Sequence, residues 1–381
     1  MKKIIELKLK ILARFVLRKY KPKIIGITGS IGKTSTKFMV GSVLKQKYRV
    51  RWAERNYNNE LGLPLAVLNE QAQGKNLFGW AGVFWRAGML LVFKNKDFPE
   101  IIVLEMGVDR PGDMDYLLSI AKPQVGVITN ISESHLEYFG SMEKLKEEKG
   151  KLAVHIPEDG TLIVNFDNTE AIEQKKKTKA KVISFGLNDG ADMQATNLSL
   201  QYEGDKFLGT KFDIKYREET ITVVQPGIMG FNHIYSDLAA VAIGFEYGMS
   251  REEILEGLKY PELPRGRMRV IEGIKYTTLI DDSYNASPQS TLSALGMLKR
   301  VRVKEGARRI AVLADMLELG SYSEAGHKEV GKYCHKIGID YLFTVGEKAQ
   351  DIKRGAIEAG MSEDQIYSFN DIATAGQFLK D

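Results

Sequence analysis

Residues 28–37, with the sequence TGSIGKTSTK, have the residue types and spacing that bind phosphate groups. An apolar strand (KIIGIT, 23–28) is predicted before them and a helix over 34–44 after them. Successive backbone N–H groups and a helix N-terminus form a cradle for anions, in which a lysine reaches terminal phosphates and a hydroxyl can bind Mg²⁺. The pattern G-x-x-x-x-G-K-[ST] would require glycine at position 27, where this chain has Ile27. A structural turn with an incidental lysine therefore stays as an alternative.

Two further polar residues follow predicted buried strands. Glu105 ends the apolar run 101–105, and His135 lies six residues after the run 125–129. The carboxyl ends of parallel strands are where open α/β sheets bind ligands, so Thr34, Glu105 and His135 could share one edge. Mg²⁺ prefers oxygen ligands, and His135 taken alone is more often a structural or exposed residue.

The elements that would position these residues are those of an α/β protein. Apolar runs at 23–28, 101–105, 125–129, 161–165 and 181–185 alternate with helical patterns and predict a doubly wound parallel sheet. Residues 191–225 alternate in polarity and predict antiparallel strands, and a helix is expected over 233–247. After a linker at 261–267, a second α/β unit is predicted with strands near 277–281, 309–313 and 341–345.

Charge is unevenly distributed along the 381 residues. The formal charge is +5, but residues 1–23 hold nine Lys or Arg against one acid, Glu6. The other 358 residues, with 45 basic and 48 acidic side chains, carry −3. This distribution argues against a nucleic-acid binder with a broad basic face. The single cysteine, Cys334, excludes an internal disulfide framework and fits a reducing compartment.

Two segments raise the question of membrane contact. Residues 1–23 predict an amphipathic helix that either packs on the body or lies on a membrane surface. Its apolar half would hold Ile4, Ile5, Leu9, Ile11, Leu12, Phe15 and Val16, and its basic half Lys2, Lys3, Lys10 and Arg14. Residues 77–93 are apolar but short for a span and contain Arg86, which favours a helix facing the core or a partner. We expect a cytoplasmic protein. Residues 1–20 and 77–93 leave open the alternative of peripheral contact with the inner face of the membrane.

Eight motifs together resemble the Mur ligase family, and within it the branch that adds D-alanyl-D-alanine in peptidoglycan synthesis. Their order and spacing are far more specific than the phosphate loop alone. They are TGSIGKTSTK (28–37), NNELGLPL (58–65), EMGVDRPGDM (105–114), TNISESHLEYFGS (129–141), EEKGKL (147–152), PRGR (264–267), DDSYNASP (281–288) and DMLELG (315–320).

The resemblance implies a P-loop parallel-sheet ATPase domain followed by a smaller Rossmann-like α/β domain. It divides the chain into a basic arm (1–23), a central ATP-binding domain (24–264) and a C-terminal domain (265–381) that we expect to be incomplete. The reaction implied joins D-Ala-D-Ala to a muramoyl-peptide carboxylate through an acyl phosphate, with ATP and two Mg²⁺ ions. Partners would be small molecules and not nucleic acid.

The same resemblance assigns roles to individual residues. Lys33 would hold the terminal phosphates, Thr34 and Glu105 one Mg²⁺, and His135 a second. Lys149 stands where the family carries a carbamylated lysine, which would supply anionic oxygens to Mg²⁺; by itself it reads as an exposed helix lysine. The remaining assignments are nucleotide contacts at Thr28, Gly29, Ser30, Gly32, Ser35, Asn232, Asp282, Tyr284 and Asn285, substrate contacts at Asn58, Asn59 and Glu60, and a γ-phosphate contact at Arg267.

The chain also departs from the family pattern. Only the basic arm (1–23) stands where the family carries a domain that binds the UDP-sugar, and the family's G-x-H-N-x-x-N stretch appears as GFNHIYS (230–236). The usual glycine before DMLELG is Ala314. The alternatives are a related ligase that adds a single amino acid, including the folylpolyglutamate synthase type, and a non-catalytic ATP-binding scaffold at the membrane.

Overall fold

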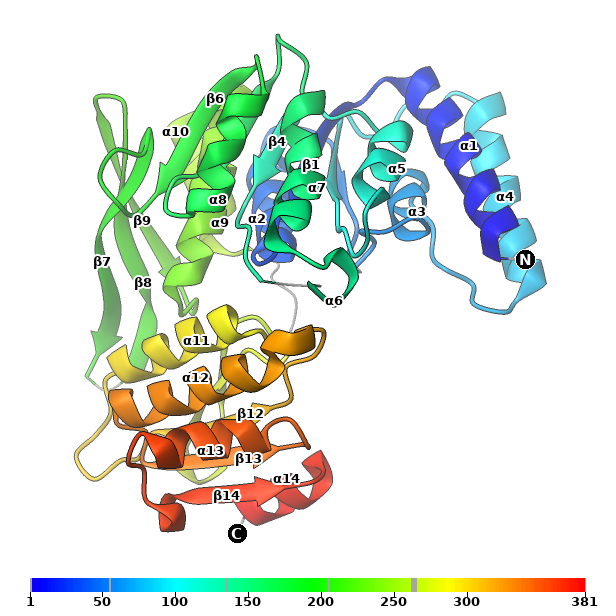
Figure 1. Cartoon of the computed structure of the whole chain (residues 1–381). Helices are drawn as coiled ribbons and strands as arrows, with labels where there is room; N and C mark the ends of the chain where they lie inside the picture. The colour runs from blue at the N-terminus through cyan, green and yellow to red at the C-terminus, as the bar shows by residue number, and fades with distance from the viewer. Residues whose placement is uncertain (1, 55, 134–135, 205, 262–265, 381) are drawn as a thin grey trace.

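The computed structural model describes residues 2–54, 56–133, 136–204, 206–261 and 266–380. A nine-stranded sheet forms the centre of the larger part, in the order β2-β3-β1-β4-β5-β6-β7-β8-β9 (Figure 1). The strands from β2 to β7 pair in parallel, whereas β7, β8 and β9 pair in antiparallel fashion. The strands are β1 (Lys23–Thr28), β2 (Val50–Trp52), β3 (Ile101–Glu105), β4 (Val125–Ile128), β5 (Thr161–Asn165), β6 (Lys181–Gly186), β7 (Met193–Glu203), β8 (Lys206–Tyr216) and β9 (Glu219–Pro226).

Helices cover both faces of this sheet, as buried parallel strands require. On β1, Ile24 belongs to one core and Ile25 and Ile27 to the other, because successive side chains point to opposite faces. The first core is covered by α1 (Lys2–Tyr20), α3 (Gly62–Leu68), α4 (Leu77–Val92), α5 (Asp113–Ile120), α6 (Leu136–Phe139), α7 (Met142–His155) and α8 (Thr169–Ile172), which continues into the 3₁₀ helix η1 (Glu173–Lys177). The second core is covered by α2 (Lys33–Leu44), α9 (Phe231–Glu246) and α10 (Arg251–Lys259).

The C-terminal part is a smaller α/β unit beneath the large sheet (Figure 1). Its parallel sheet has the order β12-β13-β14, and a separate two-stranded ribbon joins β10 and β11. The elements are β10 (Arg269–Glu272), η2 (Ile274–Tyr276), β11 (Thr278–Asp281), α11 (Pro288–Arg300), β12 (Ile310–Ala314), η3 (Gly320–Tyr322), α12 (Ser323–Ile337), β13 (Tyr341–Val345), α13 (Gln350–Glu358), η4 (Glu363–Gln365), β14 (Ile366–Phe369) and α14 (Ile372–Lys380).

The predicted strand at 277–281 exists, but it lies outside the three-stranded parallel sheet of the C-terminal part. It is β11, which pairs antiparallel with β10 so that Arg269 lies opposite Asp281. Its side chains are exposed or half-buried. A strand inside a parallel sheet needs cover on both faces, which this one lacks. The predicted linker at 261–267 lies mostly outside the described residues.

The N-terminal arm is a helix, α1, packed on the body through Leu9, Ala13, Val16 and Leu17. The predicted single apolar half is wrong: Ile4, Ile11 and Phe15 lie on the side of the helix opposite Leu9 and remain exposed, because only one side of α1 faces the core. α4 has the same character, with Trp80 buried and Trp85 exposed. In the described part of the chain we find no helix that is both long and apolar enough to cross a membrane.

Candidate nucleotide site

The candidate site lies where the connections of the sheet reverse direction. β1 stands between β3 and β4, so the chain leaves it for neighbours on opposite sides. Such a switch point opens a crevice at the carboxyl ends of the strands. Thr34 and Glu105 meet there, which confirms that these two share one edge of the sheet. His135 lies outside the described residues.

Two glycines shape the loop that follows β1. Gly29 and Gly32 have φ of 148° and 86° respectively, in the left-handed region that favours glycine. A Cβ on Gly29 would also collide with Thr129 Oγ1. Gly32 is the N-cap of α2, and no side chain among the described residues caps this helix. The first-turn N–H groups of α2 are therefore placed to bind an anion.

Lys33, the first residue of α2, points back over the loop. Its Nζ donates to the carbonyl oxygens of Gly29 at 2.6 Å and Ser30 at 3.2 Å. Burial lowers the pKa of Lys33, while the nearby Glu105 carboxylate opposes that shift. A phosphate in the loop would give this ammonium a stronger acceptor than the two carbonyls, because hydrogen bonds between charged groups are the stronger ones.

Glu105 is a buried carboxylate held by three side chains. Thr34 Oγ1 donates to its two oxygens at 3.1 and 3.2 Å, and Asn58 Nδ2 donates to Oε1 at 3.2 Å. Lys37 Nζ lies 3.3 Å from Oε2, and both side chains of this ion pair are about 98% buried or more. Burial lowers the pKa of Lys37, and Glu105 opposes the shift.

The oxygens of Thr34 and Glu105 fit a magnesium ion. Both are hard donors close to the phosphate loop, and Mg²⁺ is commonly bound by one or two carboxylates together with substrate phosphates. The described residues contain no group of three or more His, Cys, Asp or Glu that could hold a metal by themselves. Further ligands would have to come from the nucleotide or from other protein oxygens.

Lys149 is not an exposed helix lysine. It comes from α7, is only 1% exposed, and donates from Nζ to the Gly29 carbonyl at 3.1 Å. Burial lowers its pKa well below the usual lysine value, and the neighbouring charge of Lys33 lowers it further. The structure thus places a lysine with a depressed pKa beside the phosphate loop.

The three predicted substrate residues lie on the loop before α3. Asn58 contacts Glu105 as described, and its carbonyl accepts from Gly107 N at 2.8 Å. Asn59 Oδ1 accepts from Gly62 N at 2.9 Å and so supports the start of α3. Glu60 is half-buried close to these two. Only Asn58 reaches the Glu105 cluster.

Arg267 brings the C-terminal part to the site. Its guanidinium lies 4.3 Å from the ring centroid of Tyr284, and its carbonyl oxygen is 3.2 Å from His233 Nε2. Asp282 Oδ1 accepts from Met268 N at 3.2 Å. Burial raises the pKa of Asp282 to about 6, against the opposing effect of Arg267. Burial lowers the pKa of His233 to about 4, so this imidazole is neutral near pH 7.

A cavity of about 250 Å³ connects these elements. Among the described residues, three of its lining side chains have buried atoms without a hydrogen-bond partner: Asn130 Oδ1, His233 Nδ1 and Arg267 Nε. Buried polar atoms are normally paired, so these point to a polar ligand. The lining residues are Ile31, Gly32, Ser35, Thr36, Thr129, Asn130, Asn165, Asp167, Asn168, His233, Tyr235, Ser236, Arg267, Met268, Asp282, Asn285, Gln289, Ser290 and Ser293.

The remaining predicted nucleotide contacts divide into two groups. Ser35 and Asn285 line the cavity, whereas Thr28 and Ser30 hold the loop in place. Thr28 Oγ1 donates to the Met106 carbonyl at 2.8 Å, and Ser30 Oγ donates to the Ser132 carbonyl at 2.9 Å. Asn232 is in the first turn of α9, and its side chain lies outside what the structure describes.

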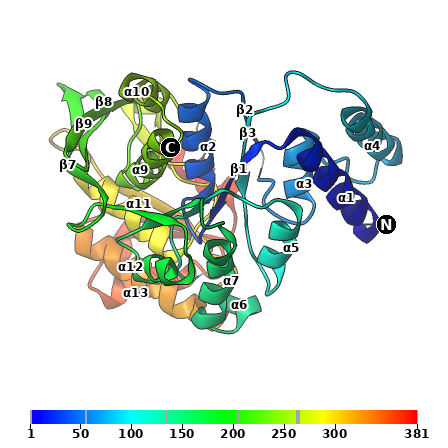
Figure 2. The same cartoon turned by 90° about the horizontal axis from the view of Figure 1, so that it is seen from above.

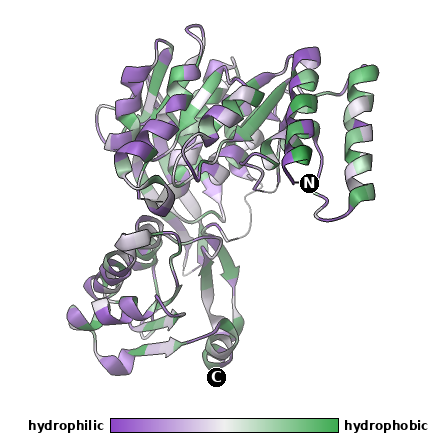
Figure 3. Ribbon diagram, turned by 45° about the vertical axis from the view of Figure 1, so that its right-hand side comes forward, coloured by the Kyte–Doolittle hydropathy of each residue, from purple (hydrophilic) through white to green (hydrophobic). Residues whose placement is uncertain are grey.

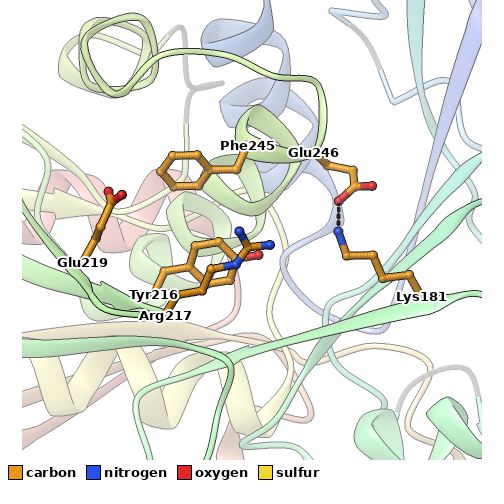
Figure 4. A pocket seen from close by; sticks show the side chains of 6 residues that line it. All are labelled: Lys181, Tyr216, Arg217, Glu219, Phe245 and Glu246. Atoms are coloured by element: carbon orange, nitrogen blue, oxygen red, sulfur yellow. Dashed lines mark hydrogen bonds and ion pairs between the residues drawn. The ribbon is translucent and has the colours of Figure 1, made fainter.

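A second, smaller pocket of about 150 Å³ lies between β6, the β8–β9 turn and α9 (Figure 4). Its lining is Lys181, Tyr216, Arg217, Glu219, Phe245 and Glu246. Lys181 Nζ already donates to Glu246 at 2.6 Å. No residue of the phosphate loop reaches this pocket, so it is separate from the candidate site.

Sequence reasoning missed residues that the fold brings into the site. Lys37 lies within the 28–37 motif, four residues after Lys33 and so on the same face of α2. That spacing was the available signal for its contact with Glu105. His233 and Tyr235 line the cavity from α9, and Asn165 and Asp167 line it from the end of β5. His233 and Tyr235 belong to the GFNHIYS stretch (230–236), which was noted only for its departure from the family pattern, and no local motif marked Asn165 or Asp167.

Comparison with known proteins agrees with this geometry. The Mur ligase middle domain matches residues 27–78 and 88–244, and the Mur ligase glutamate ligase domain matches 266–380. The UDP-N-acetylmuramoyl-tripeptide–D-alanyl-D-alanine ligase of Bacillus subtilis is 34% identical over 91% of this chain and 68% of its own length. The Escherichia coli enzyme of the same name is 29% identical over 90% and 68%. The chain thus spans about two thirds of the length of these relatives.

Solved structures show the same relationship. A crystal structure of MurF from Acinetobacter baumannii is 27% identical, covers 98% of this chain and 73% of its own, and superposes with a TM-score of 0.81. MurF ligase from Thermotoga maritima in complex with ADP is 26% identical, covers 98% and 77%, and gives a TM-score of 0.79. By its sequence, its fold and the arrangement of its phosphate loop, the chain belongs to the Mur ligase family.

Proposed function

We propose that this chain is an ATP-dependent ligase that joins D-alanyl-D-alanine to the peptide carboxylate of a muramoyl-tripeptide. The observation that carries the proposal is the cavity that joins the phosphate loop to Arg267 and Asp282, three of whose lining side chains have a buried polar atom without a partner. Relatives that share about nine tenths of the chain are named as this ligase. One related structure contains ADP.

Nucleotide binding would use groups from both parts of the chain. The loop from Gly29 to Gly32 and the first turn of α2 would bind the phosphates, and Lys33 would turn from its carbonyl acceptors to them. Arg267 would meet the γ-phosphate, with its guanidinium held over the Tyr284 ring. Asp282 and Asn285 would line the nucleotide from the C-terminal part. We assign 24–264 to the ATP-binding domain and 265–381 to the C-terminal domain.

The reaction would have two steps. A substrate carboxylate oxygen attacks the γ-phosphorus, ADP leaves, and an acyl phosphate forms. The amine of the incoming dipeptide then attacks the acyl carbon and phosphate leaves, which gives the amide. Phosphoryl transfer depends on positioning and charge neutralisation more than on covalent chemistry by the protein. Lys33 and Arg267 suit that role because both are cations beside the cavity.

Lys149 fits the carbamylation that the resemblance implies. The nucleophile for CO₂ is the neutral amine, and burial of Lys149 together with the charge of Lys33 favours that form. The carbamate would change a cation beside the loop into an anion. Two Mg²⁺ ions, one held by Thr34 and Glu105 and a second with the help of His135, would neutralise phosphate charge, and the carbamate would offer them anionic oxygens.

The test is ATP-dependent phosphate release with a panel of amines. D-Ala-D-Ala, meso-diaminopimelate, lysine and glutamate would each be offered with a UDP-linked and a UDP-free muramoyl-tripeptide. We expect turnover with D-Ala-D-Ala, and loss of turnover in Lys33→Met but not in Lys122→Met, an exposed lysine away from the loop. Turnover with only a single amino acid would make the chain a different ligase of the family, and no turnover with any pair would support a non-catalytic scaffold.

A further inference from the structure

Helices α1 and α4 lie side by side at the edge of the molecule, at the opposite end of the large sheet from β7–β9 (Figures 1 and 2). They run in the same direction. Lys19, near the end of α1, donates from Nζ to the carbonyls of Leu90, Leu91 and Phe93 at the end of α4, at 2.8–3.0 Å. Half-way along, Lys8 Nζ lies 5.6 Å from the ring centroid of Phe84.

The outer side of α1 is apolar and exposed. Ile4, Leu7, Ile11 and Phe15 have 43–61% of their surface exposed. At about 100° per residue these four positions fall within an arc of about 80°, opposite the buried Leu9 and Ala13. They therefore form one stripe along the outside of the helix.

The outer side of α4 is also apolar, and Figure 3 shows this helix mostly in green and white, with little purple. Phe78 is 91% exposed and Trp85 is 70% exposed, and Met89 and Val92 continue the same stripe. Trp80, Val83 and Ala87 on the other side are buried. Arg86 is the only charged residue of α4, and it pairs with Glu70.

The two stripes face the same way. Both helices turn their buried sides to the same core, and Lys8, Lys19 and Phe84 lie along the line where they meet. The outer stripes lie on the side away from that core, so they join into one surface. We call this surface, made of Ile4, Leu7, Ile11, Phe15, Phe78, Trp85, Met89 and Val92, the α1–α4 face.

Positive charge surrounds the α1–α4 face. On α1, Lys3, Arg14 and Arg18 are exposed beside the stripe. Lys75 comes just before α4, and Lys94 and Lys96 come just after it. The acid on α1, Glu6, is largely buried beside Lys2, at 3.8 Å, and α4 has no acid at all.

Much of the α1–α4 face lies outside the segments that match the family. The match begins at residue 27, after α1, and is interrupted over 79–87, in the middle of α4. The nucleotide cavity is built from other elements. The face therefore lies apart from the nucleotide site.

We propose that the α1–α4 face docks on the surface of an anionic lipid bilayer. Basic residues around a stripe of Trp, Phe, Leu and Ile are typical of helices that lie in the membrane interface. Each Lys or Arg close to an anionic surface adds to the attraction. Protein–protein interfaces are by contrast depleted of lysine, so the basic rim favours lipid over a protein partner. α4 has 16 residues, about 24 Å, and so lies on the bilayer and does not span it.

The test is cosedimentation of the full chain with two kinds of vesicle. One is made of phosphatidylcholine alone, and the other contains about 40% phosphatidylglycerol, which gives it a clearly negative surface. We expect binding only to the anionic vesicles, and weaker binding at high salt. Phe78→Ser/Trp85→Ser should lose it. Lys3→Glu/Arg14→Glu should weaken it by about 25-fold or more, at about fivefold for each of the two lost positive charges.

The controls change matched residues elsewhere. Tyr276→Ser/Ile372→Ser removes two exposed apolar side chains, and Lys206→Glu/Lys336→Glu reverses two exposed charges. Both should bind vesicles like the parent, and all variants should keep its ATP turnover and unfolding midpoint. Brominated lipid should quench Trp85 fluorescence in the parent, with the quenching lost in Trp85→Phe.

Two results would overturn the proposal. One is that Phe78→Ser/Trp85→Ser binds the anionic vesicles as strongly as the parent does. The other is that the parent does not bind the vesicles at all. If the parent is then a dimer that Phe78→Ser/Trp85→Ser dissociates, the face belongs to the contact with a second copy; if there is no dimer, the proposal fails without a replacement. These measurements do not depend on catalysis, so failure of the proposed ligase activity would be recognised separately.

Discussion

The ion pair of Lys37 and Glu105 should dominate the response of the site to a single substitution. Lys37→Met keeps the length and most of the volume of the side chain but leaves Glu105 buried without this cation. Removing one partner of a buried pair costs about 3–5 kcal/mol, because the other charge stays desolvated. Thr34 and Asn58 still donate to the carboxylate, so we expect the lower end, about 3 kcal/mol.

The assay is equilibrium unfolding in urea, followed by a probe of the large sheet. A loss of about 3 kcal/mol raises the unfolded fraction by more than about a hundredfold. The matched control is Lys45→Met, an exposed residue just past the end of the same helix, which should change the free energy of unfolding by less than about 0.5 kcal/mol.

The double variant Lys37→Met/Glu105→Gln completes the cycle. Removing both charges should recover a large part of the loss, since neutral side chains of similar size carry no such desolvation penalty. The reasoning is refuted if Lys37→Met costs less than about 1 kcal/mol, the value expected of an exposed pair. A double variant no more stable than the single one would equally contradict it.

Three other substitutions test separate parts of the site. The pKa of Lys149 is lowered in the folded state, so between that depressed value and 10.5 the unfolded chain binds more protons than the folded one. The free energy of unfolding should therefore rise with pH across this window. Urea titrations at several pH values should show this rise in the parent and a flatter one in Lys149→Met. Gly29→Ala should abolish ATP turnover, measured as phosphate release, because the left-handed φ and the contact with Thr129 exclude a Cβ; Gly306→Ala, a positive-φ glycine with open space, should retain activity. Tyr284→Ala should raise the KM for ATP by about two- to fivefold, the equivalent of a lost cation–π contact of about 0.5–1 kcal/mol with Arg267; an unchanged KM would show that the ring does not support this guanidinium.

Much of the fold could be predicted because its signals are local. The apolar runs that form β1, β3, β4, β5 and β6 are continuous, as strands buried on both faces must be. The antiparallel β7–β9 segment followed from alternating polarity, which a sheet with one exposed face produces. The strand β11 was predicted from its residues, but its antiparallel pairing with β10 was not, because that pairing depends on contacts outside the strand.

What the sequence determined by itself is the phosphate loop, its glycines and lysine, and the alternation of strand and helix, since these rest on backbone conformation and residue spacing. Only the tertiary structure decided that Lys149 is buried beside Gly29, that Lys37 neutralises Glu105, and that His233 and Tyr235 reach the nucleotide cavity. It also decided that an apolar stripe on α1 and another on α4 are left uncovered. Burial and contact between distant segments are set by how the sheet orders its strands, and no local pattern contains that order.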